Sequence, residues 1–95
     1  MIHASNIKVR CIPVPASLRS QGMRCFANVQ IDDALAIDGL TCRRTEQGGH
    51  VVTWPARRDS AQRFHPIVTL LKSETKAAVE RAVLDAAERG GWITP

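Results

Sequence analysis

The chain has 95 residues, 44% of them hydrophobic, and a formal net charge of +4. This length allows one domain over residues 1–95 with one modest core, and it leaves little room for a deep substrate cleft. No apolar run approaches the roughly 20 residues that a membrane span needs, and the N-terminal residues lack the hydrophobic stretch of a signal peptide. We therefore expect a cytoplasmic protein that does not enter a membrane.

The cysteines and histidines do not form the patterns of a disulfide framework or a metal site. Cys11, Cys25 and Cys42 are odd in number and widely spaced, which predicts free thiols in a reducing compartment. Neither they nor the three histidines form the close pairs typical of metal sites. The sequence also has no G-x-S-x-G elbow and no P-loop. It therefore predicts no enzyme, no cofactor or metal, and no small-molecule substrate.

Alternating apolar and polar residues predict two strands in the first third of the chain. Residues 7–12 place Lys8 and Arg10 on the outer face of a half-buried strand. Pro13 and Pro15 end this strand, residues 16–22 are an expected loop, and a longer alternation over residues 23–31 predicts the second strand. One face of the first strand should therefore be apolar and the other basic.

Two further strands follow through short connections. Asp32-Asp33 indicates a tight turn, and Gly39 predicts a bulge or bend within a strand over residues 34–44. Gly48-Gly49 then leads into a fourth strand over residues 50–54. The second, third and fourth strands should form a meander.

The last part of the chain changes character. After Pro55, residues 56–63 predict a polar, basic loop, and residues 64–67 a short extended piece. Between Ser73 and Arg89 apolar residues recur at helical spacing, with Ser73 as the expected N-cap. The predicted fold class is thus α+β, with an antiparallel sheet of about four strands and one C-terminal amphipathic helix on one face.

Positive charge is concentrated before the helix. Residues 1–66 carry nine Lys or Arg against five Asp or Glu, whereas residues 67–95 carry four of each. Residues 43–63 alone hold five arginines against two acidic residues. Arginine suits bidentate contact with phosphate, and Arg57 and Arg58 should be exposed after Pro55. This pattern predicts binding to a polyanion such as nucleic acid, although an adjacent arginine pair is often only solvated surface.

Two residues near this segment leave alternatives open. Trp54 could stack on a base or serve in packing or a dimer contact, and the sequence supports both equally. His65 precedes Pro66, which favours extended geometry. A ring that bonds to the backbone and fixes the turn is a simpler explanation of His65 than a catalytic or pH-sensing imidazole.

The order of these features resembles the SpoVG family, the stage V sporulation protein G and septation regulators of bacteria. The matching stretches are Ile7-Lys8-Val9-Arg10, Ile31-Asp32-Asp33, Leu35-Ala36-Ile37-Asp38-Gly39, Trp54-Pro55-Ala56-Arg57-Arg58, His65-Pro66-Ile67, Thr75-Lys76 and Ala82-Val83-Leu84. The sequence departs from the family pattern at Trp54, where an aliphatic residue is usual, in a shorter loop over residues 59–64, and in extra length at Leu70-Leu71-Lys72.

The resemblance implies a small dimeric protein with a curled antiparallel sheet that binds DNA and RNA and regulates gene expression. Together with the charge pattern, it gives the expected nucleic-acid-binding residues, which are Lys8, Arg10, Arg57, Arg58, Arg63, Thr75 and Lys76. The alternative from another class is a protein-interaction module whose basic surface meets an acidic partner, without a specific nucleic-acid target.

Overall fold

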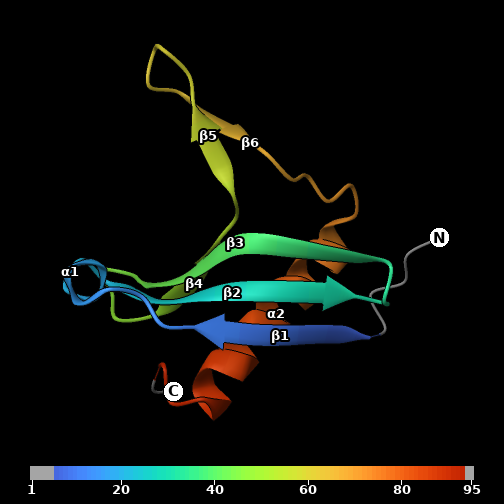
Figure 1. The fold of residues 1–95 in the computed structure, drawn as a ribbon, viewed down its shortest axis with the longest axis horizontal. Helices are drawn as coiled ribbons and strands as arrows, with labels where there is room; N and C mark the ends of the chain where they lie inside the picture. The colour runs from blue at the N-terminus through green and yellow to red at the C-terminus, as the bar shows by residue number, and fades with distance from the viewer. Residues whose placement is uncertain (1–5, 94–95) are drawn as a thin grey trace.

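The computed structural model describes residues 6–93. Its elements in chain order are β1 (Ile7–Ile12), α1 (Ala16–Arg19), β2 (Met23–Ile31), β3 (Leu35–Arg44), β4 (His50–Thr53), β5 (Ala56–Arg58), β6 (Phe64–Pro66) and α2 (Ser73–Arg89). One antiparallel sheet has the order β1-β2-β3-β4, and β5 pairs with β6 in a separate hairpin. The predicted α+β class and four-stranded meander are confirmed. Figure 1 shows α2 crossing behind the sheet and the hairpin projecting from it.

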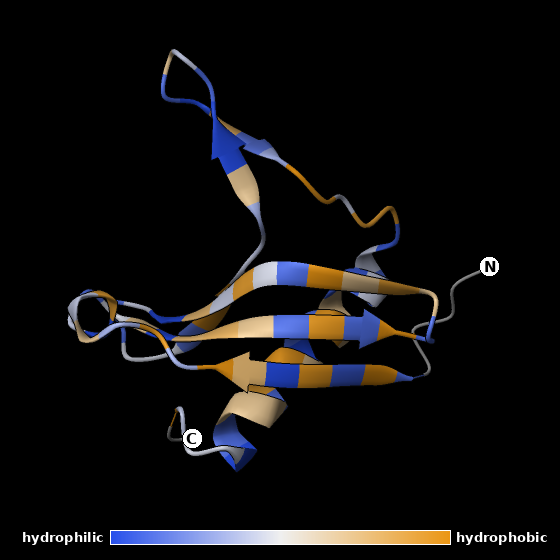
Figure 2. Ribbon diagram, in the orientation of Figure 1, coloured by the Kyte–Doolittle hydropathy of each residue, from blue (hydrophilic) through white to orange (hydrophobic). Residues whose placement is uncertain are grey.

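Alternation along β1 and β2 separates two faces of the sheet. The strands pair without interruption from Ile7 opposite Ile31 to Ile12 opposite Phe26. The side chains of β2 that are buried beneath α2 are Cys25, Ala27, Val29 and Ile31. Because successive side chains alternate, Lys8 and Arg10 lie on the face away from α2, which we call the open face. Figure 2 shows the alternation as blue and orange bands along β1.

A bulge at Gly39 keeps β3 in phase with the core. Ala27 pairs with Leu40 but Val29 pairs with Ile37, so β3 carries one extra residue between these pairs. Gly39 has a φ of +84°, a conformation that only glycine adopts without strain. Ile37 and Leu40 consequently both face α2 although they are three residues apart. The predicted bulge is confirmed.

Helix α2 closes the core with side chains four residues apart. Val79, Val83 and Ala87 are each fully buried against the sheet, and the helix contacts all four of its strands. Burial of each large aliphatic side chain stabilises the fold by about 1.5–3 kcal/mol. Within residues 6–93, no helix is both long and apolar enough to cross a membrane.

The expected N-cap of α2 is wrong by one residue. Lys72 occupies the cap position in extended geometry, and it makes no side-chain capping bond. Ser73 is already the first helical residue, so its hydroxyl is not placed to accept from the first-turn amides. At the other end, Gly91 has a φ of +78° and turns the chain back under the helix.

The three cysteines line one end of the core as free thiols, as predicted. Cys25 and Cys42 are cross-strand partners on β2 and β3 and are fully buried, whereas Cys11 is partly buried. A hydrogen bond with Cys42, together with burial, raises the pKa of the Cys25 thiol. Burial also raises the pKa of Cys11. Both thiols are therefore protonated and poorly nucleophilic at neutral pH.

Two expected loops contain regular structure. Residues 16–19 form the short helix α1, because the carbonyl of Pro15 accepts from the amides of Leu18 and Arg19 at 3.0 and 3.1 Å. The expected basic loop after Pro55 begins as strand β5, which pairs with the short extended piece β6. The prediction of an extended segment at residues 64–67 is confirmed, since β6 covers residues 64–66, but its pairing with β5 was not predicted.

Candidate nucleic-acid interface

The most prominent basic feature is the β5–β6 hairpin, residues 55–67, which we call the arm. Ile67 N–H donates to the carbonyl of Pro55 at 3.1 Å and closes its base. Arg57 and Arg58 are exposed, and the side chain of Arg63 is 77% exposed. The arm follows β4 in the chain and projects from the sheet (Figure 1), and most of its residues are exposed.

Asp59 organises the tip of the arm. Its Oδ1 accepts from the backbone amides of Ala61 and Arg63 at 2.8 and 3.0 Å. Its Oδ2 lies 2.7 Å from His65 Nε2 and 3.4 Å from Arg63 Nε. The bond with His65, followed by the Arg63 amide, lowers the pKa of Asp59. His65 was expected to bond to the backbone, and the structure corrects its partner to a carboxylate.

Two neighbouring side chains orient the guanidinium group of Arg58. Its guanidinium carbon lies 4.7 Å above the centre of the Phe64 ring, in cation–π geometry. Its Nη1 also donates to Gln62 Oε1 at 3.3 Å. These contacts orient the group and leave most of its five N–H donors available to an incoming phosphate.

Arg57 and Arg58 point to opposite faces of the arm. Arg57 is opposite His65, and Arg58 is opposite Phe64. Cross-strand partners share a face and successive residues alternate, so the two arginines cannot act as one patch. Arg57 makes no ion pair or hydrogen bond through its side chain with any residue between 6 and 93. The positive charge of the arm is therefore divided between an Arg57 side and an Arg58 side.

The first-strand residues form a separate basic region. Lys8 and Arg10 are exposed on the open face, where Lys8 Nζ lies 4.0 Å from Asp33 Oδ1. Strand β1 is one edge of the sheet, and the chain reaches the arm from β4 at the other edge. Pro55 at the base of the arm lies against Gly39 of β3, and neither β5 nor β6 contacts β1. A single copy of the chain therefore keeps the two basic regions apart.

Thr75 and Lys76 lie in the first turns of α2, on the layer behind the sheet. Lys76 is exposed and Thr75 is half-buried. Because Lys8 and Arg10 occupy the opposite face, the expected binding residues fall into three groups: the arm, the open face and the start of α2. A single flat surface through all seven residues is not present in one copy of the chain.

The open face also carries a residue that sequence reasoning did not select. Phe26 pairs with Ile12 and Thr41, which places its ring on the same side as Lys8 and Arg10. An aromatic ring beside basic residues is the usual platform for an unpaired base. The alternation of β2 already contained this signal, since it assigned Phe26 to the outer face.

Trp54 is explained by packing. Its indole packs against the core, and Nε1 donates to Glu80 Oε2 at 2.7 Å. Of the two alternatives that the sequence left open, the structure supports a packing role that ties the base of the arm to α2.

The fold and the site define a small α+β protein that displays arginines on a projecting hairpin and basic side chains on an open sheet face. The SpoVG family model matches residues 4–89. The chain belongs to the SpoVG family, which confirms the resemblance seen in the sequence and suggests a regulator related to sporulation or septation. The comparison with curated proteins found no match.

Proposed function

We propose that the protein is a homodimeric regulator that binds DNA or RNA through phosphate contacts rather than an enzyme. The observation that supports this most is the arm, because Arg57, Arg58 and Arg63 are exposed on a hairpin that contributes little to the core. Oriented arginines match phosphate geometry, and an aromatic ring under Arg58 adds a stacking surface.

Exposed apolar side chains in and just after the arm support the proposed dimer. Phe64, Ile67 and Leu71 are 64%, 61% and 96% exposed. Figure 2 shows the hydrophobic colour of the link between β6 and α2. Such exposed apolar residues on one side of a small protein favour association with another protein surface. A second copy would cover them and bring two arms side by side.

Binding should weaken steeply with salt. If each subunit contacts about three phosphates, the logarithm of affinity should fall against the logarithm of salt concentration with a slope of about −0.9 for each phosphate on duplex DNA. A gel-shift series on one duplex and one single-stranded RNA, from low to physiological salt, measures the slope. A slope near zero would contradict phosphate binding.

The second candidate function is docking of an acidic protein on the arm and the link that joins it to α2. The exposed Ile67 and Leu71 favour it, because nucleic-acid backbones offer no apolar surface for them. It predicts weak, sequence-blind nucleic-acid binding and a co-purifying protein. Light scattering tests whether the apolar side chains serve a homodimer or a different protein. A dimer is expected, whereas a monomer at all concentrations would support docking of a different protein.

A further inference from the structure

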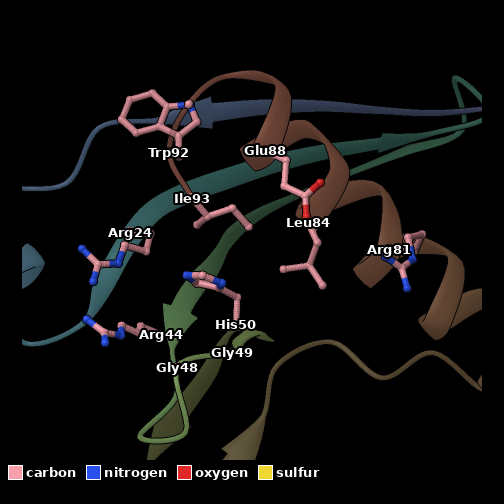
Figure 3. A pocket seen from close by; sticks show the side chains of 11 residues that line it. Arg24, Arg44, Gly48, Gly49, His50, Arg81, Leu84, Glu88, Trp92 and Ile93 are labelled. Atoms are coloured by element: carbon pink, nitrogen blue, oxygen red, sulfur yellow. The ribbon is translucent and has the colours of Figure 1, made fainter. Parts of the chain in front are cut away.

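A hollow lies at the end of the sheet where β2 begins and β3 ends. The last turns of α2 and the chain after it form one wall, and the β3–β4 turn forms another (Figure 3). Its volume is about 660 Å³, within the range of small-molecule sites. No residue of the proposed phosphate-binding set lines it. The sequence predicted no cleft of this size, because the hollow forms between segments that are distant in the chain.

Three arginines from three elements line this hollow. Arg24 is the second residue of β2, Arg44 ends β3 and Arg81 belongs to α2. Glu88 is the acidic residue among the lining side chains. His50 is the cross-strand partner of Arg44, so their side chains share a face. The lining therefore holds three permanent positive charges against one negative charge. Such a concentration of guanidinium groups suits a ligand with more than one negative charge.

The position of Arg24 depends on a bulge in β2. Met23 pairs with Arg43 and Cys25 pairs with Cys42, which leaves Arg24 without a cross-strand partner on β3. Regular alternation would place Arg24 on the open face with Phe26, whereas it lines the hollow on the helix side. The pKa of the buried Cys42 is lowered by its hydrogen bond with Cys25 and also by the charge of Arg24, which agrees with this placement. Bulges that redirect a side chain are frequent beside functional sites.

Trp92 adds an aromatic side chain to the lining of the hollow. After Gly91 reverses the chain, the amide of Trp92 donates to the carbonyl of Ala87 at 2.9 Å. A Cβ on Gly90 would lie 2.7 Å from Trp92 Nε1, so the indole rests on a position that only glycine allows. Leu84 and Ile93 complete the apolar part of the lining.

The hollow combines positive charge with an aromatic side chain, which suits a ligand that has both an anionic group and a flat ring. We propose that the hollow binds a nucleotide, with its phosphates against Arg24 and Arg44 and its base against Trp92. Arg81 lies at the rim of the hollow and adds positive charge there. Its side chain is 73% exposed, and its Nη1 lies 3.9 Å from Asp85 Oδ1. The nucleotide is either free in solution or part of a strand. This site goes beyond the phosphate-backbone contacts of the arm and is independent of them.

The test uses the whole protein and ATP, tripolyphosphate and adenosine as probes in calorimetry and ¹H–¹⁵N NMR. ATP should bind more tightly than either of the other two probes, and it should shift the indole signal of Trp92. The indole of Trp54, bonded to Glu80, is the internal reference. Trp92→Ala should reduce the affinity for ATP to that for tripolyphosphate. Adenosine binding as tightly as ATP, or no shift at Trp92, would overturn the proposal.

Variants separate the hollow from general surface charge. Arg24→Ala and Arg44→Ala should each weaken ATP binding about tenfold. Arg43→Ala is the matched control, because Arg43 is adjacent to Arg44 in sequence and exposed, but it does not line the hollow. Glu88→Gln should tighten binding by removing the opposing charge. Equal weakening of ATP binding in the Arg43 and Arg44 variants would contradict the site.

Two further measurements identify the source of the nucleotide and keep this site distinct from the arm. A short single-stranded oligonucleotide that displaces ATP and shifts Trp92 indicates a nucleotide within a strand; ATP binding without displacement indicates a free one. The Arg57→Glu, Arg58→Glu double variant should bind ATP like the wild type. Loss of ATP binding in that variant would contradict the independence of the two sites.

Discussion

Leu40→Ala should lower the free energy of unfolding by about 2–5 kcal/mol. Leu40 is fully buried, pairs with Ala27 and packs in the cluster that contains Val79 and Val83. Its truncation removes apolar packing where the sheet meets α2 and leaves a cavity that the surrounding strands fill only in part. Total stability for a domain of this size is about 5–15 kcal/mol, so the change is a large fraction.

Urea unfolding followed by circular dichroism measures this effect. Leu71→Ala is the matched control, because it removes the same atoms from a side chain that is 96% exposed. In monomeric protein it should change the free energy of unfolding by less than about 0.5 kcal/mol. Both variants should be compared at a concentration where light scattering gives a monomer. Similar destabilisation in the two variants would contradict the assignment of the core.

The stability of the tip of the arm should depend on pH through Asp59. The pKa of Asp59 is lowered in the folded protein. The contribution of its carboxylate to stability is therefore fully present above the ordinary aspartate pKa and is lost as pH falls through the lowered pKa. The amide signals of Ala61 and Arg63, which donate to Asp59, should therefore titrate at a lower pH in the folded protein than in urea. An equal or higher midpoint in the folded protein would contradict the hydrogen-bonded tip.

Local patterns were sufficient for the large elements of the fold. The alternation of residues 23–31 and the helical spacing of Val79, Val83 and Ala87 each extend over several repeats, so their period is unambiguous. Strand β5 has only three residues, too few to display a period. Its conformation depends on pairing with β6 and on the bonds of Asp59 at the tip, neither of which a local pattern reveals.

The candidate site was predictable in its residue types but not in its geometry. A loop would have allowed Arg57 and Arg58 to act as a pair, whereas a strand directs them to opposite faces. The strand order, which sequence alone did not establish, places Lys8 and the arm at opposite edges of the sheet. Trp54 was ambiguous because its partner, Glu80, is 26 residues away. In each case the missing information was an interaction between distant parts of the chain.

The Arg57→Glu, Arg58→Glu double variant should weaken nucleic-acid binding by about ten- to a hundredfold. The arginine on the face of the arm that contacts nucleic acid is a charge-assisted hydrogen-bonding group of about 1.5–3 kcal/mol, and each 1.4 kcal/mol corresponds to about a factor of ten. The salt slope should also decrease by about one for each phosphate that a subunit no longer binds. Both side chains are exposed and outside the core, so circular dichroism should show an intact fold.

The control for this experiment is the Arg19→Glu, Arg89→Glu variant, which makes the same change in net charge at two exposed arginines outside the arm. It should retain most of the affinity, because screening limits the effect of distant charges. The single variants then identify the face of the arm that is used. Binding on the Phe64 side predicts that Arg58→Glu accounts for most of the decrease in affinity, whereas binding on the His65 side predicts this of Arg57→Glu. If the double variant and its control bind equally weakly, the arm is not the binding site and net charge alone drives association.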